Sequence, residues 1–158
     1  MNAEDTTALL RNQAFFKGLG EQQIAKLGVI AREVRFGRDH VLFREGEEST
    51  DFYLIISGMV ALEIAPPSDT LRVETLSAGD AFGFSSVMGH GTVFQGRVLQ
   101  DLHALAFDAA QLRTLCETDT AFGYEFMRRL MRVVAGRLQV TRLHLIDTYW
   151  PVAKRAGA

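Results

Sequence analysis

The side chains that most often carry chemistry are few in this chain of 158 residues, and they do not form a catalytic pattern. The sequence contains no phosphate-binding loop, no serine–histidine–aspartate order around a nucleophile elbow and no paired-carboxylate signature. Its four histidines are scattered, and none has a second histidine or cysteine at metal-ligand spacing: His40, His90, His103 and His144. We therefore expect neither an enzyme nor a metal site.

The single cysteine and the balanced charge exclude further classes of protein. Cys116 alone cannot form a disulfide framework, a multi-cysteine zinc site or a cysteine-held iron–sulfur cluster, and we expect it to be a buried apolar filler. The net charge of −2 provides no global basic field for nucleic acid. A solvated helix face is the simpler explanation for the arginines of one C-terminal segment: Arg128, Arg129, Arg132, Arg137 and Arg142.

The sequence also lacks the signals of membrane insertion and secretion. No apolar run approaches the roughly 20 residues of a transmembrane helix, and the acidic first five residues are unlike a signal peptide. Nothing within these residues is of the kind that reads base edges. We therefore expect a cytoplasmic protein without a membrane partner and without a nucleic acid partner within this chain.

The spacing of apolar residues divides the chain into helical, strand-rich and again helical parts. Residues 1–30 have the three- and four-residue spacing of two short helices, separated by Gly18 and Gly20. Residues 31–108 alternate apolar and polar side chains in short strands, with turn signals every eight to twelve residues. This pattern predicts an antiparallel sandwich or roll and does not choose between them. Helical spacing returns over residues 109–149, and residues 150–158 form a loose tail.

The longest predicted helix runs from Asp119 to Tyr149, a stretch without proline. About 30 residues at 1.5 Å each span roughly 45 Å, which exceeds what one small roll can cover. Apolar residues recur along it at the spacings of a coiled-coil seam: Met127, Leu130, Val134, Leu138, Thr141 and Leu145. Burial against the chain's own roll explains the first half of this seam equally well, but the distal part needs another surface.

Three motifs occur in order along the strand-rich part. They are VLFREGE at residues 41–47, DFYLIISGMV at residues 51–60 and LSAGDAFG at residues 76–83. Together they resemble the cyclic nucleotide-binding domains of catabolite-activator-type transcription factors, protein kinase A regulatory subunits and gated channels. The family's glycine before its second strand is replaced by Asp39, which tolerates left-handed backbone geometry.

The resemblance implies a mainly β fold with flanking helices. The expected core is an antiparallel double-stranded β-helix, a β-roll of jelly-roll type, over residues 31–108. N-terminal helices precede it, and C-terminal lid and dimerisation helices follow over residues 109–149. In the transcription factors of this family the lid helix pairs with its twin, so the resemblance implies a homodimer formed through the C-terminal helix.

The family's phosphate-binding cassette is altered in this sequence. Family members hold the ribose with a glutamate directly after Phe-Gly, and they hold the phosphate with an arginine. Here Phe84 follows Gly83, and a phenyl ring accepts no hydrogen bond from a ribose hydroxyl. The position of the family's arginine falls near Phe94 when counted forward from Gly83, and at Thr92 and Val93 when counted back from the next strand. Neither place holds a cation in this sequence. Arg97 is the nearest one.

The positions expected to bind a ligand follow from this cassette. They are Gly83, Phe84, Ser85, Ser86, Thr92, Val93, Phe94 and Arg97. The segment after Gly83 can open a short helix, and the hydroxyls of Ser85 and Ser86 can donate to an anion. Losing the bidentate partner of a buried phosphate costs about 2–5 kcal/mol, so we expect weak binding of cAMP or cGMP, or capture of another small anion. A pocket filled by its own phenylalanines, without a ligand, is the alternative.

Three hypotheses for function remain open. The leading one is a regulatory, ligand-sensing module that transmits occupancy of an atypical pocket to a partner. The second is a ligand-free scaffold for interaction or dimerisation. The third is the sensor half of a truncated transcription regulator, because full regulators of this type carry a helix-turn-helix domain of about seventy residues after the lid helix.

Overall fold

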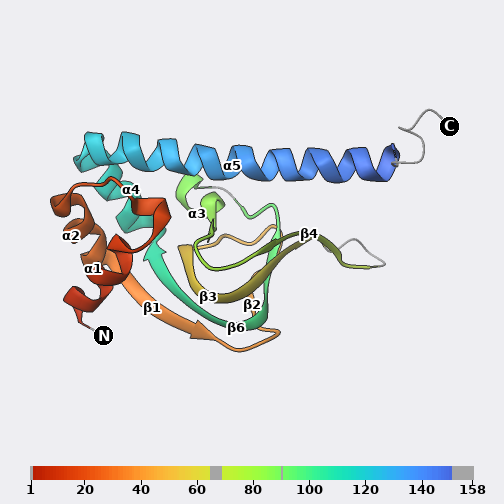
Figure 1. The fold of residues 1–158 in the computed structure, drawn as a ribbon, viewed down its shortest axis with the longest axis horizontal. Helices are drawn as coiled ribbons and strands as arrows, with labels where there is room; N and C mark the ends of the chain where they lie inside the picture. Colours follow the sequence, from red (N-terminus) through yellow and green to blue (C-terminus); the bar gives the residue numbers. More distant parts are fainter. Residues whose placement is uncertain (1, 65–68, 90, 151–158) are drawn as a thin grey trace.

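The computed structural model describes residues 2–64, 69–89 and 91–150. Helices at the N-terminus are followed by strands and then by helices again, as predicted (Figure 1). The elements are α1 (Ala3–Arg11), η1 (Ala14–Phe16), α2 (Glu21–Ile30), β1 (Ala31–Phe36), β2 (Val41–Phe43), β3 (Asp51–Ile64), β4 (Leu71–Leu76), β5 (Ala81–Phe82), α3 (Phe84–Met88), β6 (Gln95–Asp108), α4 (Ala109–Thr118) and α5 (Thr120–Tyr149). Apart from Trp150, the predicted tail lies outside the described residues.

The strands form one antiparallel sheet of six strands, curled as Figure 1 shows. The main path is β1-β6-β3-β4, with β2 paired to β6 and β5 paired to β3. The two longest strands, β3 and β6, pair from Asp51↔Asp108 to Glu63↔Gln95, with register shifts around Gly58. Such irregularities bend and twist a strand pair, which lets a single sheet curl into a roll. The predicted mainly β fold class with flanking helices is confirmed.

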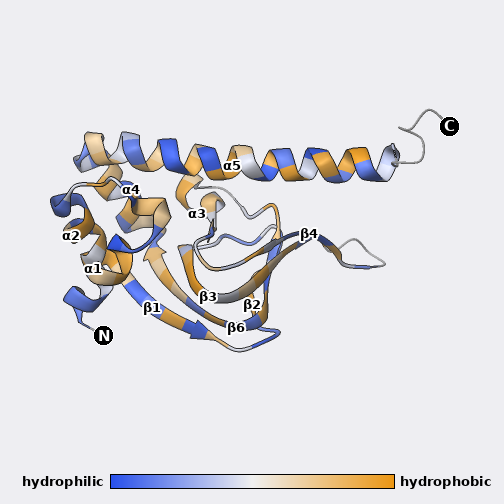
Figure 2. Ribbon diagram, in the orientation of Figure 1, coloured by the Kyte–Doolittle hydropathy of each residue, from blue (hydrophilic) through white to orange (hydrophobic). Residues whose placement is uncertain are grey.

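The sheet is buried on both faces at its centre. Phe52 and Leu54 of β3 pack in the core between the sheet and the helices, whereas Tyr53 and Ile55 pack in a second core within the roll. This two-sided burial explains why residues 52–56 are a continuous apolar run instead of an alternating one. Figure 2 shows the same apolar centre where β3 and β6 run side by side.

Two of the positions with positive φ shape the roll. Gly58 has a φ of +101°, and a Cβ atom placed there would lie 2.3 Å from the backbone oxygen of Asp101 on β6. Asp39 has a φ of +70°, as expected for the residue that replaces the family's glycine. The turn before β2 and the bend of β3 therefore depend on these two residue types.

Helix α5 is fixed at its first turn by Asp119. This side chain accepts a hydrogen bond from the backbone N–H of Phe122 at 3.1 Å and forms an ion pair with Lys26 of α2 at 3.0 Å. The N-terminal half of α5 then packs on the roll through Phe122, Phe126 and Leu130. Its C-terminal part extends past the roll, with alternating apolar and polar residues along it (Figures 1 and 2).

Replacing Gly58 by alanine tests the close approach of β3 and β6. We expect Gly58→Ala to lower the free energy of unfolding by about 1–3 kcal/mol or more, because the added methyl group is strained and also clashes with β6. Denaturant unfolding provides the measurement. Gly46→Ala is the matched control, since Gly46 also has positive φ but has open space around its Cβ position. Equal losses in the two variants would contradict the importance of the close approach.

Candidate functional site

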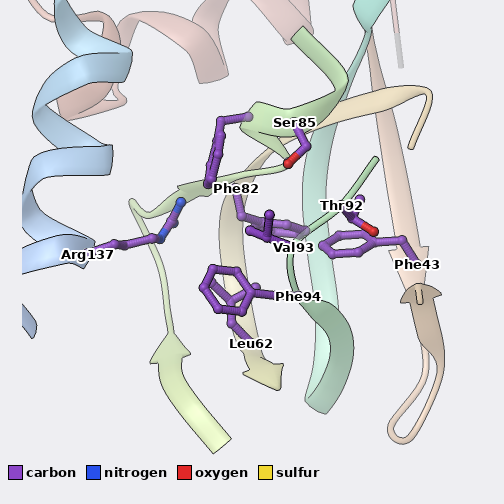
Figure 3. Close-up of a pocket in the computed structure, with 10 residues that line it drawn as sticks. Phe43, Leu62, Phe82, Ser85, Thr92, Val93, Phe94 and Arg137 are labelled. Atoms are coloured by element: carbon purple, nitrogen blue, oxygen red, sulfur yellow. The ribbon is translucent and has the colours of Figure 1, made fainter. Parts of the chain in front are cut away.

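A small cavity lies where the cassette was predicted. It has a volume of about 20 Å³, which is room for about one water molecule. Its wall is formed by strands, by α3, by the segment before β6 and by one residue of α5 (Figure 3). The lining residues are Phe43, Leu62, Phe82, Gly83, Phe84, Ser85, Thr92, Val93, Phe94 and Arg137.

The short helix expected after Gly83 is present as α3. Gly83 has a φ of +87°, and a Cβ atom on it would lie 2.7 Å from the backbone oxygen of Asp51. Only glycine can therefore turn the chain from β5 into α3 at this point. The hydroxyl of Ser86 donates to the Gly83 carbonyl at 2.6 Å, so it stabilises the turn and does not face the cavity, whereas Ser85 lines it.

Thr92 binds a neighbouring turn. Its hydroxyl donates to the carbonyl oxygen of Arg44 at 2.6 Å, and its backbone N–H donates to that of Glu47 at 3.0 Å. The N–H of Gly46 donates in return to the Thr92 carbonyl at 2.8 Å. These bonds fix the segment before β6 against the turn between β2 and β3, and they place Val93 beside the cavity.

The cavity wall is dominated by aromatic rings. Phe43 and Phe82 have ring centroids 6.1 Å apart, and Phe84 and Phe94 complete the wall from α3 and from the segment before β6. Figure 3 shows Phe43, Phe82 and Phe94 gathered around one space with Leu62 and Val93. Seven positions from Gly83 to Phe94 were expected to meet at the cassette, and six of them line the cavity, the exception being Ser86. Three hydrophobic residues from the strands join them.

Arg97 lies outside the cavity wall, which corrects the expectation that it could bind a ligand there. Its guanidinium forms two hydrogen bonds with Glu63, of 2.9 and 2.8 Å, and lies 3.4 Å from Asp39. Glu63 is almost fully buried. These hydrogen bonds hold the pKa of the Glu63 carboxyl below its usual range. A cation bonded twice to a buried carboxylate has no freedom to turn toward the cassette.

Arg137 is the cation in the cavity wall, which corrects the expectation that it belongs to a solvated helix face. Its side chain is one-tenth exposed. One terminal nitrogen, Nη2, donates to the carbonyl oxygen of Ala81, and Nε lies 3.4 Å from a carboxylate oxygen of Glu74 without forming a hydrogen bond. Within the described residues Nε and Nη1 have no hydrogen-bond partner. Burial lowers the pKa of this guanidinium, and the carboxylates of Glu74 and Asp80 partly oppose that effect.

A sequence signal for Arg137 did exist. Phe122, Phe126 and Leu130 are buried at four-residue spacing, and Arg137 continues their face of the helix seven residues later. An arginine on the buried face of an amphipathic helix requires an ion-pair or hydrogen-bond partner, or it has a function.

The predicted solvated face is correct for Arg128, Arg132 and Arg142, which are exposed. It is wrong for Arg129, whose side chain is 11% exposed and donates to the Phe15 carbonyl at 2.9 Å.

The outward seam of α5 differs from the predicted one by one residue. Leu130 is buried in the core, so it does not belong to the exposed seam. Met131, which is 72% exposed, takes its place. The outward residues then follow alternating spacings of four and three: Met127, Met131, Val134, Leu138, Thr141 and Leu145. This is the spacing of one continuous coiled-coil stripe, and it extends onto the part of α5 beyond the roll.

An apolar groove of about 330 Å³ connects this stripe to α3. Two residues line it from α3 and four from α5: Phe84, Met88, Met127, Leu130, Met131 and Val134. Phe84 also lines the small cavity. One phenyl ring therefore separates the cassette from the exposed stripe of α5.

Other chemistry finds little support in the part of the chain that is described. Among these residues no group of three or more histidine, cysteine or acidic side chains is placed to hold a metal ion. Burial raises the pKa of Cys116 to about 11, so this thiol is protonated at neutral pH. None of the described helices is apolar over a sufficient length to cross a membrane.

The fold and the cassette define the class of this protein. The sequence model of the cyclic nucleotide-binding domain matches residues 33–119, more than half of the chain, and the chain belongs to this family. It is similar to a CRP-like cAMP-activated global transcriptional regulator of Mycobacterium tuberculosis, with 30% identity over 141 residues. That match covers 88% of this chain and 61% of the relative, so the chain spans about three fifths of the relative's length.

Solved structures share the fold at lower sequence identity. A cyclic nucleotide-binding domain of Methylobacillus flagellatus superposes with a TM-score of 0.78 at 16% identity, covering 92% of this chain and 83% of that one. A regulatory subunit of a cAMP-independent protein kinase A of Trypanosoma brucei superposes with a TM-score of 0.73 at 18% identity, covering 92% of this chain and 51% of that one.

The Arg97–Glu63 pair predicts a pH-dependent stability. Because Arg97 lowers the pKa of Glu63, the pair stabilises the fold above the ordinary carboxyl pKa of about 4.3, and this stabilisation is lost as the pH falls through the lowered value. We expect Arg97→Gln to lower the free energy of unfolding at pH 7 by about 1–3 kcal/mol, between the limits for exposed and buried pairs. Denaturant unfolding between pH 7 and pH 3 measures this.

The difference between the wild-type protein and this variant should shrink toward pH 3. Arg35→Gln serves as the control, since Arg35 forms an exposed pair with Glu33 and its loss should cost less than about 1 kcal/mol. A difference for Arg97→Gln that stays constant across the pH range would contradict the assignment.

Proposed function

We propose that this domain is a regulatory, ligand-sensing module, not an enzyme, whose pocket departs from the usual way of binding cyclic nucleotides. It works in the cytoplasm as a homodimer formed through α5. The observation that carries this proposal is the position of Phe84, which lines both the cassette cavity and the groove beside the exposed stripe of α5. A ligand that moves this ring changes the surface on which the partner helix packs.

The altered chemistry of the pocket supports weak binding of cAMP and cGMP. The Trypanosoma structure is that of a triple variant bound to cAMP, in which a glutamate is replaced by alanine and a threonine and the valine after it are replaced by arginine and alanine. Thr92 and Val93 are the same pair of residue types, at one of the two places where the cassette arginine is expected. The Mycobacterium relative, described as a cAMP-activated transcriptional regulator, supports a regulatory role.

A second candidate function is a scaffold that dimerises without a ligand. The observation in its favour is that the aromatic side chains of the wall leave a cavity of only about 20 Å³. Calorimetry separates the two functions, because a scaffold binds neither cyclic nucleotides nor smaller anions, whereas a sensor binds at least one of them once Phe84 and Phe94 give way.

Restoring the cassette residues should restore cAMP binding. We expect Thr92→Arg combined with Val93→Ala, with Phe84→Glu as a further step, to bind cAMP about 10- to 1,000-fold more tightly than the wild-type protein. Isothermal calorimetry measures the affinity. Thr92→Gln with Val93→Ala is the matched control, since it loses the same hydroxyl group but gains no charge. Wild-type affinity equal to that of the restored variant would contradict the proposed departure from the family's binding mode.

The dimer is tested on the exposed stripe of α5. We expect Val134→Glu with Leu138→Glu to convert the dimer into a monomer, because four glutamates would replace apolar side chains where two helices meet. Sedimentation equilibrium gives the mass. Gln139→Glu with Leu143→Glu adds the same charge to exposed positions outside the stripe and should leave the dimer intact. A monomeric wild-type protein would exclude the proposed assembly.

A further inference from the structure

Arg137 is buried although its contacts use few of its hydrogen-bond donors. Its side chain is about nine-tenths buried, and the burial is not matched by bonding, because Nε and Nη1 donate to nothing within the described residues. The hydrogen bond to Ala81 satisfies one of the five N–H groups of the guanidinium. A buried cation with unused donors is costly unless something else accepts from it.

The direction of this side chain is toward the cassette. Arg137 is the only residue of α5 in the cavity wall as described, and Figure 3 shows its guanidinium directed from the helix toward Phe82 and α3. Ser85 lines the same cavity from α3. We propose that Arg137 is the anion-binding residue of this pocket, supplying from α5 the positive charge that the cassette itself lacks. This inference rests on the proposed ligand-sensing function.

The wall of the pocket indicates the class of ligand. Guanidinium nitrogens on one edge suit a planar or tetrahedral oxyanion, and the four phenyl rings suit a flat apolar body. Glu74 lies 3.4 Å from Nε, so part of the positive charge is already balanced, which favours a singly charged anion over a multiply charged one. The ligand class is therefore a flat aromatic monoanion, and a phosphodiester joined to a ring system has this chemistry.

The ligand needs more room than the present cavity provides. Val93 is about half exposed on the outer segment of the wall, so its side chain can move outward freely, whereas Phe94 packs against the core within the roll. On the other side of Arg137 lies a groove of about 320 Å³ between α5 and the segment from β4 to β5, which Glu74 and Asp80 also line. Arg137 therefore separates the interior cavity from an outer groove.

The charge of the ligand is the variable that tests Arg137. We expect the wild-type protein to bind cAMP at least about 10-fold more tightly than adenosine, which has the same base and ribose but no phosphate. In Arg137→Met this preference should disappear, with adenosine affinity changed much less. Isothermal calorimetry at low salt measures all four affinities, and Arg97→Met, which removes an arginine outside the cavity, should retain the preference.

Glu74→Gln is expected to change cAMP affinity in the direction opposite to Arg137→Met. It removes the internal carboxylate that competes for Arg137, so cAMP affinity should rise severalfold, whereas Arg137→Met should lower it. A merely structural role for the Arg137–Glu74 contact predicts that both variants, which break the same contact, change cAMP affinity in the same direction. That result would overturn the inference.

A variant with an enlarged cavity tests the inference if the wild-type pocket is too small to admit a ligand. Phe94→Ala removes one ring from the wall, and the same comparison of cAMP with adenosine is made with Arg137 and with methionine at position 137. Binding of both compounds without any dependence on Arg137 would overturn this inference and leave the sensing function standing. Absence of binding of cAMP, cGMP and adenosine in both backgrounds would overturn the sensing function as well.

Discussion

The antiparallel ladder between β3 and β6 is the interaction on which the rest of the structure depends. These two strands of 14 residues carry the other strands: β4 and β5 pair with β3, and β1 and β2 pair with β6. Leu62 of β3 lines the cavity directly, while Phe82 and Phe43 reach it from strands held by this ladder. Where the register shifts around Gly58, the ladder bends, and one sheet can enclose a core and still offer its other face to the helices.

The helical lid connects the cassette to the surface through one face of α5 and one ring of α3. Helix α5 packs with Phe126 and Leu130 on the core, places Arg137 against the cavity and keeps a separate apolar stripe outward. Helix α3 is also held by α4, because Arg113 of α4 donates a hydrogen bond to the Ser86 carbonyl at 2.6 Å. The cassette helix α3 therefore contacts α4 through this hydrogen bond and lines the groove beside α5.

Much of the fold could be predicted from the sequence, because its signals are local. The three motifs, the short helix after Gly83 and the left-handed position at Asp39 depend on residues close together in the chain. The length of α5 followed from the absence of proline between Asp119 and Tyr149. Residues of the cassette were placed at the cavity for the same reason.

The errors concern contacts between distant segments. Arg97 was considered for the cavity, but its partner Glu63 lies on a strand more than thirty residues earlier, and only the pairing of β3 with β6 brings them together. Leu130 was placed in a seam whose first half fitted burial on the roll equally well, and the choice between Leu130 and Met131 as the outward residue requires the rotation of the helix on the roll. The same missing rotation left Arg137 among the solvated arginines.

The fixed start of α5 has a mechanical consequence. Asp119 ties the first turn both to its own backbone and to Lys26, so this end of the long helix is fixed in place. Arg137 lies about 27 Å along the helix and Tyr149 about 45 Å, at 1.5 Å per residue. For a rigid helix that tilts about its fixed end, the far tip travels about 1.7 times as far as Arg137 does.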